Sequence, residues 1–216
     1  MRRRAAILVL LIAPVFAVAE LVDRIAAIVG TNIITLSDVL KQIRLTALLN
    51  GTEPDNGAAS RREAAQRLIE QMLIRREMGS TGESSQVAKA IGPELLELLK
   101  TRYPTEGAYR EALRKYDVTD EDVKSQLLWQ TQLVHFVDQR FRPPLPPSES
   151  DLRDYYESTF VPDWPSTHDG KPPSFDEARE EVERQAMEQL ANNALDRWLG
   201  QARTQTRIRL MPEAFK

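Results

Sequence analysis

The spacing of hydrophobic residues predicts two short strands at the start of the chain, helices through most of it, and a strand near its end. Residues 21–29 and 33–35 are largely apolar and are separated by a Gly-Thr-Asn turn, which is typical of a β-hairpin. Apolar side chains then recur at three- and four-residue steps, as helices require. Residues 207–210 alternate polar and apolar, so we expect a third strand that stabilises the hairpin. The predicted fold is mainly α: a helical core with a small antiparallel sheet formed by the N-terminal hairpin and a C-terminal strand.

The helix predicted over residues 119–141 has an unusually wide apolar face. Thr119 and the three acidic residues after it are typical of a helix start. One apolar stripe comprises Val123, Leu127, Val134, Val137 and Phe141. A second stripe beside it comprises Leu128, Trp129, Leu133 and Phe136. A face this wide either contacts more than one neighbour or is partly open to a ligand. The second stripe is therefore interpreted either as core against the C-terminal helix or as the lining of a groove for a bound chain.

Proline-rich segments divide the chain after this helix. Residues 142–147 (RPPLPP) predict a stiff, extended linker. A short helix is expected over residues 148–156, and residues 160–173, with four prolines, are expected to form a loop. Ser174 and Glu177 form a capping box that starts a helix of about thirty residues. The predicted parts are a helical core at 20–141, a proline-rich linker with one short helix at 142–173, and a long helix with a strand at 174–216 that packs back on the core.

The long C-terminal helix carries an apolar series that is interpreted as one face. The series steps by three and four residues and comprises Phe175, Ala178, Val182, Ala186, Leu190, Ala194 and Trp198.

The first 19 residues are typical of a secretory signal peptide. Three arginines follow Met1, residues 5–16 are almost wholly apolar, and Ala17-Val18-Ala19 matches a small-x-small cleavage site. We expect cleavage after Ala19 and a periplasmic mature protein, with an uncleaved N-terminal anchor as the alternative. The apolar run is shorter than the roughly 20 residues of a transmembrane helix, and no second long apolar segment follows. The mature form is therefore not expected to span a membrane.

Composition narrows the chemistry that is open to the chain. Cysteine is absent, which excludes disulfides, thiol catalysis and zinc–thiolate sites. Three of the 29 basic residues lie within the signal peptide and no acidic residue does, so cleavage moves the net charge from −3 to −6. Binding to a nucleic-acid backbone depends on clustered cations, so a nucleic-acid partner is not expected.

No motif in the chain indicates catalysis or cofactor binding. His135 is predicted to be a packing residue of the 119–141 helix, and His168 an exposed loop residue. The acidic residues at 120–122 lack the glycine and alternating acids of a calcium loop, so they are interpreted as helix-capping residues. We therefore predict no catalytic residue, no cofactor and no metal ligand.

Several segments together resemble SurA-type periplasmic chaperones. The resemblance is carried by residues 22–30 (VDRIAAIVG), 33–39 (IITLSDV), 68–77 (LIEQMLIRRE), 195–199 (LDRWL) and 208–210 (IRL). It implies a helical core with a small sheet that binds unfolded outer-membrane proteins during export. The group usually also carries parvulin-type prolyl isomerase domains before the C-terminal helix. Only 33 residues lie between positions 142 and 174, whereas domains rarely have fewer than about 50. An isomerase domain is therefore not expected, and the protein is predicted not to be an enzyme.

Three functions remain open at this level. The first is an ATP-independent holdase of the periplasm that binds unfolded exported polypeptides, with outer-membrane proteins as the expected partners. Its candidate client-binding residues are Leu128, Trp129, Leu133 and Phe136. The second is a peptidyl-prolyl isomerase related to the parvulin-associated chaperones. The third is a structural or assembly subunit that holds one fixed partner.

Overall fold

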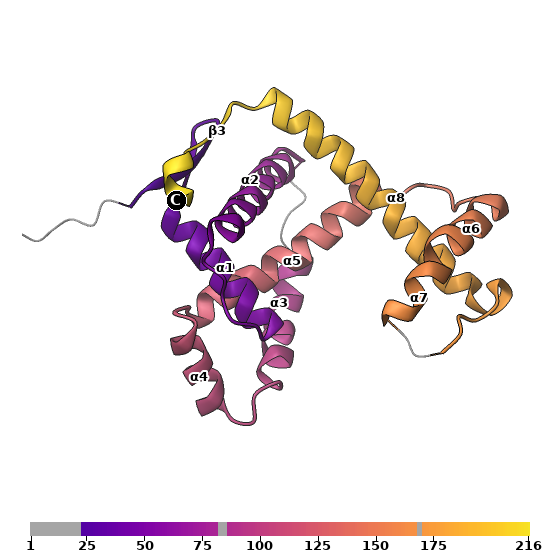
Figure 1. Cartoon of the computed structure of the whole chain (residues 1–216), viewed down its shortest axis with the longest axis horizontal. Coiled ribbons are helices and arrows are strands. Elements are labelled where there is room, and N and C mark those ends of the chain that lie inside the picture. Colours follow the sequence, from indigo (N-terminus) through magenta and orange to yellow (C-terminus); the bar gives the residue numbers. More distant parts are fainter. Residues whose placement is uncertain (1–22, 82–85, 168–169) are drawn as a thin grey trace, which may run out of the picture.

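The protein is mainly helical with one small sheet, as the hydrophobic spacing predicts (Figure 1). The computed structural model describes residues 23–81, 86–167 and 170–216, so the predicted signal peptide and His168 lie outside it. Its helices are α1 (Leu36–Asn50), α2 (Ala58–Thr81), α3 (Gln86–Lys100), α4 (Glu106–Lys115), α5 (Asp120–Phe141), α6 (Glu149–Tyr155), the π-helix η1 (Tyr156–Phe160), α7 (Val161–Thr167), α8 (Phe175–Gln205) and the 3-10 turn η2 (Pro212–Phe215).

The sheet joins the two ends of the described chain. Strands β1 (Ile25–Val29) and β2 (Asn32–Thr35) form the predicted hairpin, and β3 (Ile208–Leu210) pairs antiparallel with β1 on its other side. The predicted third strand is therefore confirmed, with β1 in the centre of the order β2-β1-β3. Side chains alternate across the pleat. The inner face is buried against the helices, and η2 adds Phe215, which is only 2% exposed.

Two hydrophobic clusters hold together a main body, defined as the sheet, α1 to α5 and the C-terminal part of α8. The first cluster lies under the sheet between α1, α2, the second half of α5 and the end of α8. The second cluster lies between α1, α3, the end of α4 and the start of α5. Helix α5 reaches both clusters, and the predicted threonine cap at its start is present as part of a capping box, with the Thr119 hydroxyl 2.6 Å from Asp122.

The region between the proline linker and α8 differs from the prediction. In place of a linker with one short helix and a loop, α6, η1 and α7 follow one another without a break. Of these, α6 and η1 pack on the first turns of α8, and α7 packs on η1. We call these elements and residues 175–186 of α8 the small lobe. Of the four prolines expected to form a loop, two lie inside α7, and the helix continues through Pro165 and the earlier Pro162. The wider π-helical turn ends just before it, with the Val161 N–H bonded to the Tyr156 carbonyl.

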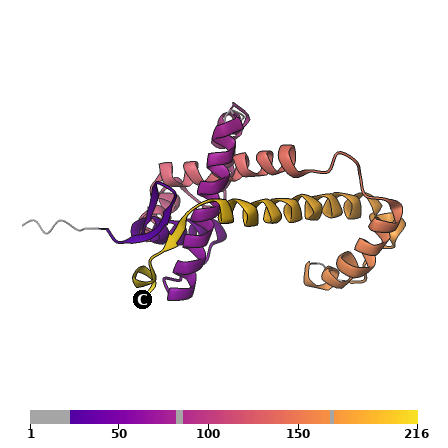
Figure 2. The same cartoon turned by 90° about the horizontal axis from the view of Figure 1, so that it is seen from above.

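Helix α8 connects the small lobe to the main body and uses two different sides to do so. Its small-lobe contacts end at Ala186, and its contacts with the first cluster begin at Leu195. Nine residues at 100° each amount to two and a half turns, so the two sets of side chains point in opposite directions. Seen from above, α5 runs along one side of α8 and the small lobe lies on the other (Figure 2). The interpretation of one continuous face from Phe175 to Trp198 is therefore wrong, because each four-residue step advances 40° around the helix.

Candidate functional site

The structure places the four predicted client-binding residues mainly in the interior. Trp129 and Phe136 are 3% and 5% exposed and belong to the first cluster. Leu133 is half-buried and packs against that cluster, and Leu128 is also half-buried. Neither aromatic ring is accessible to a client in this conformation. Of the two interpretations of this stripe, packing against neighbouring helices is the one that the geometry supports.

The Trp129 ring is covered by a cation from a neighbouring helix. The guanidinium carbon of Arg75 on α2 lies 4.3 Å from the ring centroid, in a cation–π arrangement. Burial lowers the pKa of Arg75 below its usual value, and the guanidinium still carries its charge at neutral pH because arginine is effectively always protonated in proteins. Arg75 therefore closes one side of the ring instead of leaving it open to a partner.

Phe136 belongs to an aromatic cluster that fixes α8 on α5. Its ring centroid lies 5.6 Å from that of Phe141 and 6.3 Å from that of Trp198, both in edge-on geometry. Such pairs each stabilise a fold by about 0.5–1.5 kcal/mol beyond the burial of their area. The predicted contact between α5 and the C-terminal helix is thus made by these three rings.

Of the seven large apolar side chains that are exposed among the described residues, three lie on the segments that join the two lobes, and the other four are Ile25, Ile33, Leu98 and Leu210. We define the bridge as the second half of α5, residues 142–148 and the middle of α8. It carries Val134, Leu145 and Leu190, which are 69%, 75% and 43% exposed. Single exposed hydrophobic residues are normal in proteins, so these three are candidates for binding apolar chains only because they share the region between the lobes.

The direction of Val134 follows from the periodicity of α5. Val134 lies seven residues after Leu127, which is about 20° less than two full turns, so the two side chains point in nearly the same direction. Leu127 is buried in the second cluster. Val134 therefore projects on the side of α5 that carries α1 and α3. In Figure 1, α5 extends past α3 toward α8, so this stripe continues beyond the helices that cover its first half. The hydrophobic spacing placed Val134 and Leu190 on apolar stripes without showing that either is exposed, because periodicity does not reveal where a covering helix ends.

The described residues contain no arrangement that indicates catalysis. His135 is half-buried on α5, and no group of three or more metal-ligating side chains is found within the described ranges. Tyr109 is buried and donates a hydrogen bond to Asp120 at 2.9 Å. Burial, together with that carboxylate, raises the pKa of Tyr109 above its usual value, so it stays protonated as a structural donor.

A small pocket lies between α1, the loop that follows it and the start of α2. Its volume is about 170 Å³, below the roughly 300–1,000 Å³ of typical ligand sites. The charged groups at its rim have partners: Glu53 pairs with Lys115, Glu63 pairs with Arg67, and Asp55 accepts a hydrogen bond from Ser60. This pocket provides neither the room nor the free charge that a cofactor requires.

Comparison with known proteins leaves the chain without an identified family. No protein-family model matches it, and a search of curated proteins finds no match. Across the part of the chain that the structure covers, none of the helices combines the length and hydrophobicity needed to cross a bilayer.

Proposed function

We propose that the protein is an ATP-independent chaperone, a holdase that binds unfolded exported polypeptides in the periplasm and releases them without chemical change. The single observation that carries this proposal is the exposure of Val134, Leu145 and Leu190 on the bridge. The resemblance of residues 22–39 and 68–77 to SurA-type chaperones and the signal-peptide pattern at 1–19 support it independently. In this proposal, outer-membrane proteins are the main clients.

The bridge suits weak, general binding of unfolded chains. Its apolar residues lie on three separate segments and are not gathered in one deep pocket, so a client can contact them in many registers. Burial of apolar surface contributes about 25 cal/mol per Å² before ordering costs are subtracted. A few exposed side chains therefore hold a client without trapping it, as a holdase requires.

The organisation of residues 142–174 favours binding over isomerase activity. The described residues of this segment are helical or extended linker, and with the start of α8 they enclose a core of six buried side chains. Those side chains pack against one another as the core of the small lobe. The segment is thus occupied by a small helical core of fewer residues than a separate isomerase domain needs, which supports a holdase over a prolyl isomerase.

The test of the proposal is suppression of aggregation. The mature protein, in stoichiometric amounts, is expected to reduce light scattering by an outer-membrane protein diluted from urea. A triple variant, V134S/L145S/L190S, should lose most of this effect because it removes the exposed apolar surface of the bridge. A matched triple variant, Q130S/Q139S/Q189S, changes exposed polar residues of α5 and α8 and should retain it.

Either of two results would overturn the proposal. One is normal aggregation of the client at a tenfold excess of the mature protein. The other is full activity in the apolar triple variant when circular dichroism shows that it is folded. A protease-coupled proline-peptide assay on the same preparations tests the isomerase alternative, for which no rate above background is expected. Capture of one stoichiometric partner in place of many clients would favour an assembly subunit.

A further inference from the structure

Strand β3 leaves one edge of the sheet unpaired. The register with β1 pairs Ile28 with Arg209, the Gly30 N–H donates to the Arg207 carbonyl at 2.9 Å, and the Met211 N–H donates to the Ala26 carbonyl at 2.9 Å. Residues 207, 209 and 211 thus direct their backbone groups toward β1. Alternation along an antiparallel strand then directs the N–H and C=O groups of residues 208 and 210 away from the sheet. An edge of this kind accepts another extended chain.

The side chains along this edge alternate between charged and apolar. Arg207 and Arg209 are exposed, and two-residue spacing places them on one face of the strand. That is the outer face, because Arg209 lies opposite Ile28, and Ile28 lies opposite Ile33, which is 51% exposed. Ile208 packs on the first cluster under the sheet, and Leu210 is 43% exposed.

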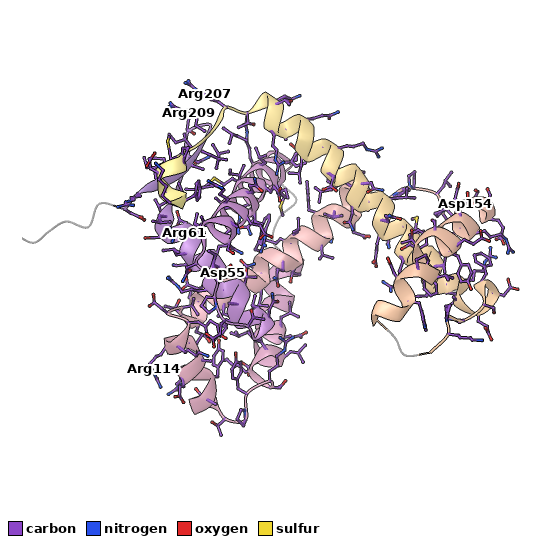
Figure 3. The ribbon with its side chains drawn as sticks, in the orientation of Figure 1. Asp55, Arg61, Arg114, Asp154, Arg207 and Arg209 are labelled. Atoms are coloured by element: carbon purple, nitrogen blue, oxygen red, sulfur yellow. The ribbon has the colours of Figure 1, made fainter. Side chains whose placement is uncertain are left out.

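The two arginines have no acidic partner among the described residues. Neighbouring ion pairs use other groups: Arg203 pairs with Glu70, and Lys216 pairs with Glu213. Figure 3 shows Arg207 and Arg209 close together where the chain enters β3, with their side chains directed away from the helices. Two like charges on one face of a free strand attract a partner that carries carboxylates at the same spacing.

From these observations we propose that β3 binds an extended polypeptide segment in which acidic and apolar residues alternate. The segment adds to the sheet as a fourth strand beside β3. Its backbone pairs with residues 208 and 210, its carboxylates lie opposite Arg207 and Arg209, and its apolar side chains extend the inner face beside Ile208 and Leu210. This site lies on the sheet and not on the bridge, and it does not depend on the holdase proposal.

The test uses fluorescent ten-residue peptides and the folded mature protein. A peptide of alternating valine and glutamate should bind saturably, more weakly as salt is added, because exposed charge pairs are screened. Three matched peptides separate the contributions: one with lysine for glutamate, one with the same residues in blocks, and one with the alternating backbone nitrogens methylated. All three are expected to bind at least about tenfold more weakly, since each removes either the charge match or the strand pairing.

Variants locate the site. R207Q/R209Q should weaken binding of the alternating peptide about tenfold, as two exposed ion pairs predict. R114Q, which changes an exposed arginine on α4 far from the sheet, should not change it (Figure 3). L210P removes one outward N–H but none of the groups that bond to β1, and it should weaken binding while the melting temperature reports on its folding. Hydrogen exchange at residues 208 and 210 should slow when the peptide binds.

Several results would overturn this proposal. Absence of saturable binding up to about 1 mM peptide would do so, as would equal affinity for the lysine peptide or for the methylated peptide. Unchanged exchange at residues 208 and 210 in the saturated complex would also contradict strand addition. The bridge variant V134S/L145S/L190S should bind the alternating peptide normally, so a failure here is distinguishable from a failure of the holdase proposal.

Discussion

The main body and the small lobe are built from the same kinds of helix but differ in how much core they contain. Among the residues whose burial the structure describes, the main body buries seventeen side chains in its first cluster and nine in its second, whereas the small lobe buries six. A unit of fewer than about 40 residues seldom folds alone without a disulfide or a metal, and this chain has no cysteine. The small lobe therefore depends on α8, whose continuous backbone connects it to the larger core.

This difference also separates two roles of apolar side chains. In the main body, helices cover one another on several sides, and even the wide face of α5 becomes interior around Trp129 and Phe136. Between the lobes, α5 and α8 extend beyond their partners, and Val134 and Leu190 remain exposed. The candidate binding residues thus lie where a helix extends beyond the neighbouring helices that would bury them.

The largest expected effect comes from placing a charge in each core. Val123 in the second cluster and Val182 in the small lobe are both 0% exposed. Replacing either with aspartate leaves a carboxylate without a partner, which costs about 4 kcal/mol. V123D should unfold the main body and with it the whole chain, whereas V182D should unfold only the small lobe. Hydrogen exchange measured by mass spectrometry over residues 25–50 and 152–164 checks both outcomes.

The isosteric variants V123T and V182T serve as milder controls for this pair. If V182D removes protection from residues 25–50 as well, the two lobes unfold as one unit and the small lobe has no independent stability.

A smaller effect is expected from a proline in the middle of α8. Gln189 is exposed between the two sets of contacts, and Q189P removes one helical hydrogen bond at a local cost of about 3 kcal/mol. Both cores should survive, but the small lobe should lose its fixed orientation. Because the chain has no cysteine, nitroxide labels at Q66C and E157C are uniquely placed, one on each lobe.

The distance distribution between those labels, measured by pulsed electron resonance, should broaden in Q189P and stay narrow in Q189A. A narrow distribution in the proline variant would mean that residues 142–148, and not α8, fix the small lobe.

The smallest expected effect is the loss of folding stability at acidic pH. Hydrogen bonds from Ser148 and Ser174 hold the pKa values of Asp151 and Glu177 below their usual 3.8 and 4.5, and Arg179 does the same for Glu149. In the described chain, the main body has the same number of such groups: hydrogen bonds with Thr35 and Ser60 lower the pKa values of Asp23 and Asp55. Burial acts to raise the pKa of Asp122, but hydrogen bonds from Thr119 and Lys41 leave it lowered. A depressed pKa stabilises the fold above the unfolded value, and the contribution is lost as pH falls through the folded value.

Below about pH 4.5, the small lobe should therefore lose structure before the main body, because three such carboxylates support a core of only six side chains. Trp164 packs in the small lobe, so the difference in fluorescence between the wild type and W164F follows that lobe. S148A/S174A should weaken this pH dependence. Simultaneous loss of both lobes at one pH would contradict the expectation.

Local sequence signals predicted much of this fold. The alternation at residues 207–210 indicated β3, and the capping residues Thr119 and Ser174 correctly marked the starts of α5 and α8. Both signals act through neighbours in the chain and so can be read from a single sequence. The small lobe was not predicted, because prolines interrupt helices in general and the π-helical turn before Pro162 has no simple sequence signature.

The candidate site was less predictable than the fold. Val134 and Phe136 lie two residues apart with similar hydrophobicity, yet one is 69% exposed and the other 5%. Which of them is covered depends on where α3 and α8 meet α5, which is a property of tertiary packing. Strand β3 itself could be predicted from the sequence, but the fact that one of its edges is unpaired follows only from the strand order β2-β1-β3.

The half-turn offset along α8 has a further consequence for how the molecule tolerates changes in length. One residue inserted between Ala186 and Leu195 would rotate the small lobe by about 100° around the axis of α8 and move it about 1.5 Å along that axis. The cluster at each end of α8 would stay intact. Seven inserted residues would return the small lobe to within about 20° of its present orientation around α8, displaced roughly 10 Å along the helix axis. The angle between the lobes is thus encoded in a residue count, so the length of this stretch is constrained in addition to Leu190 and the buried Ala191.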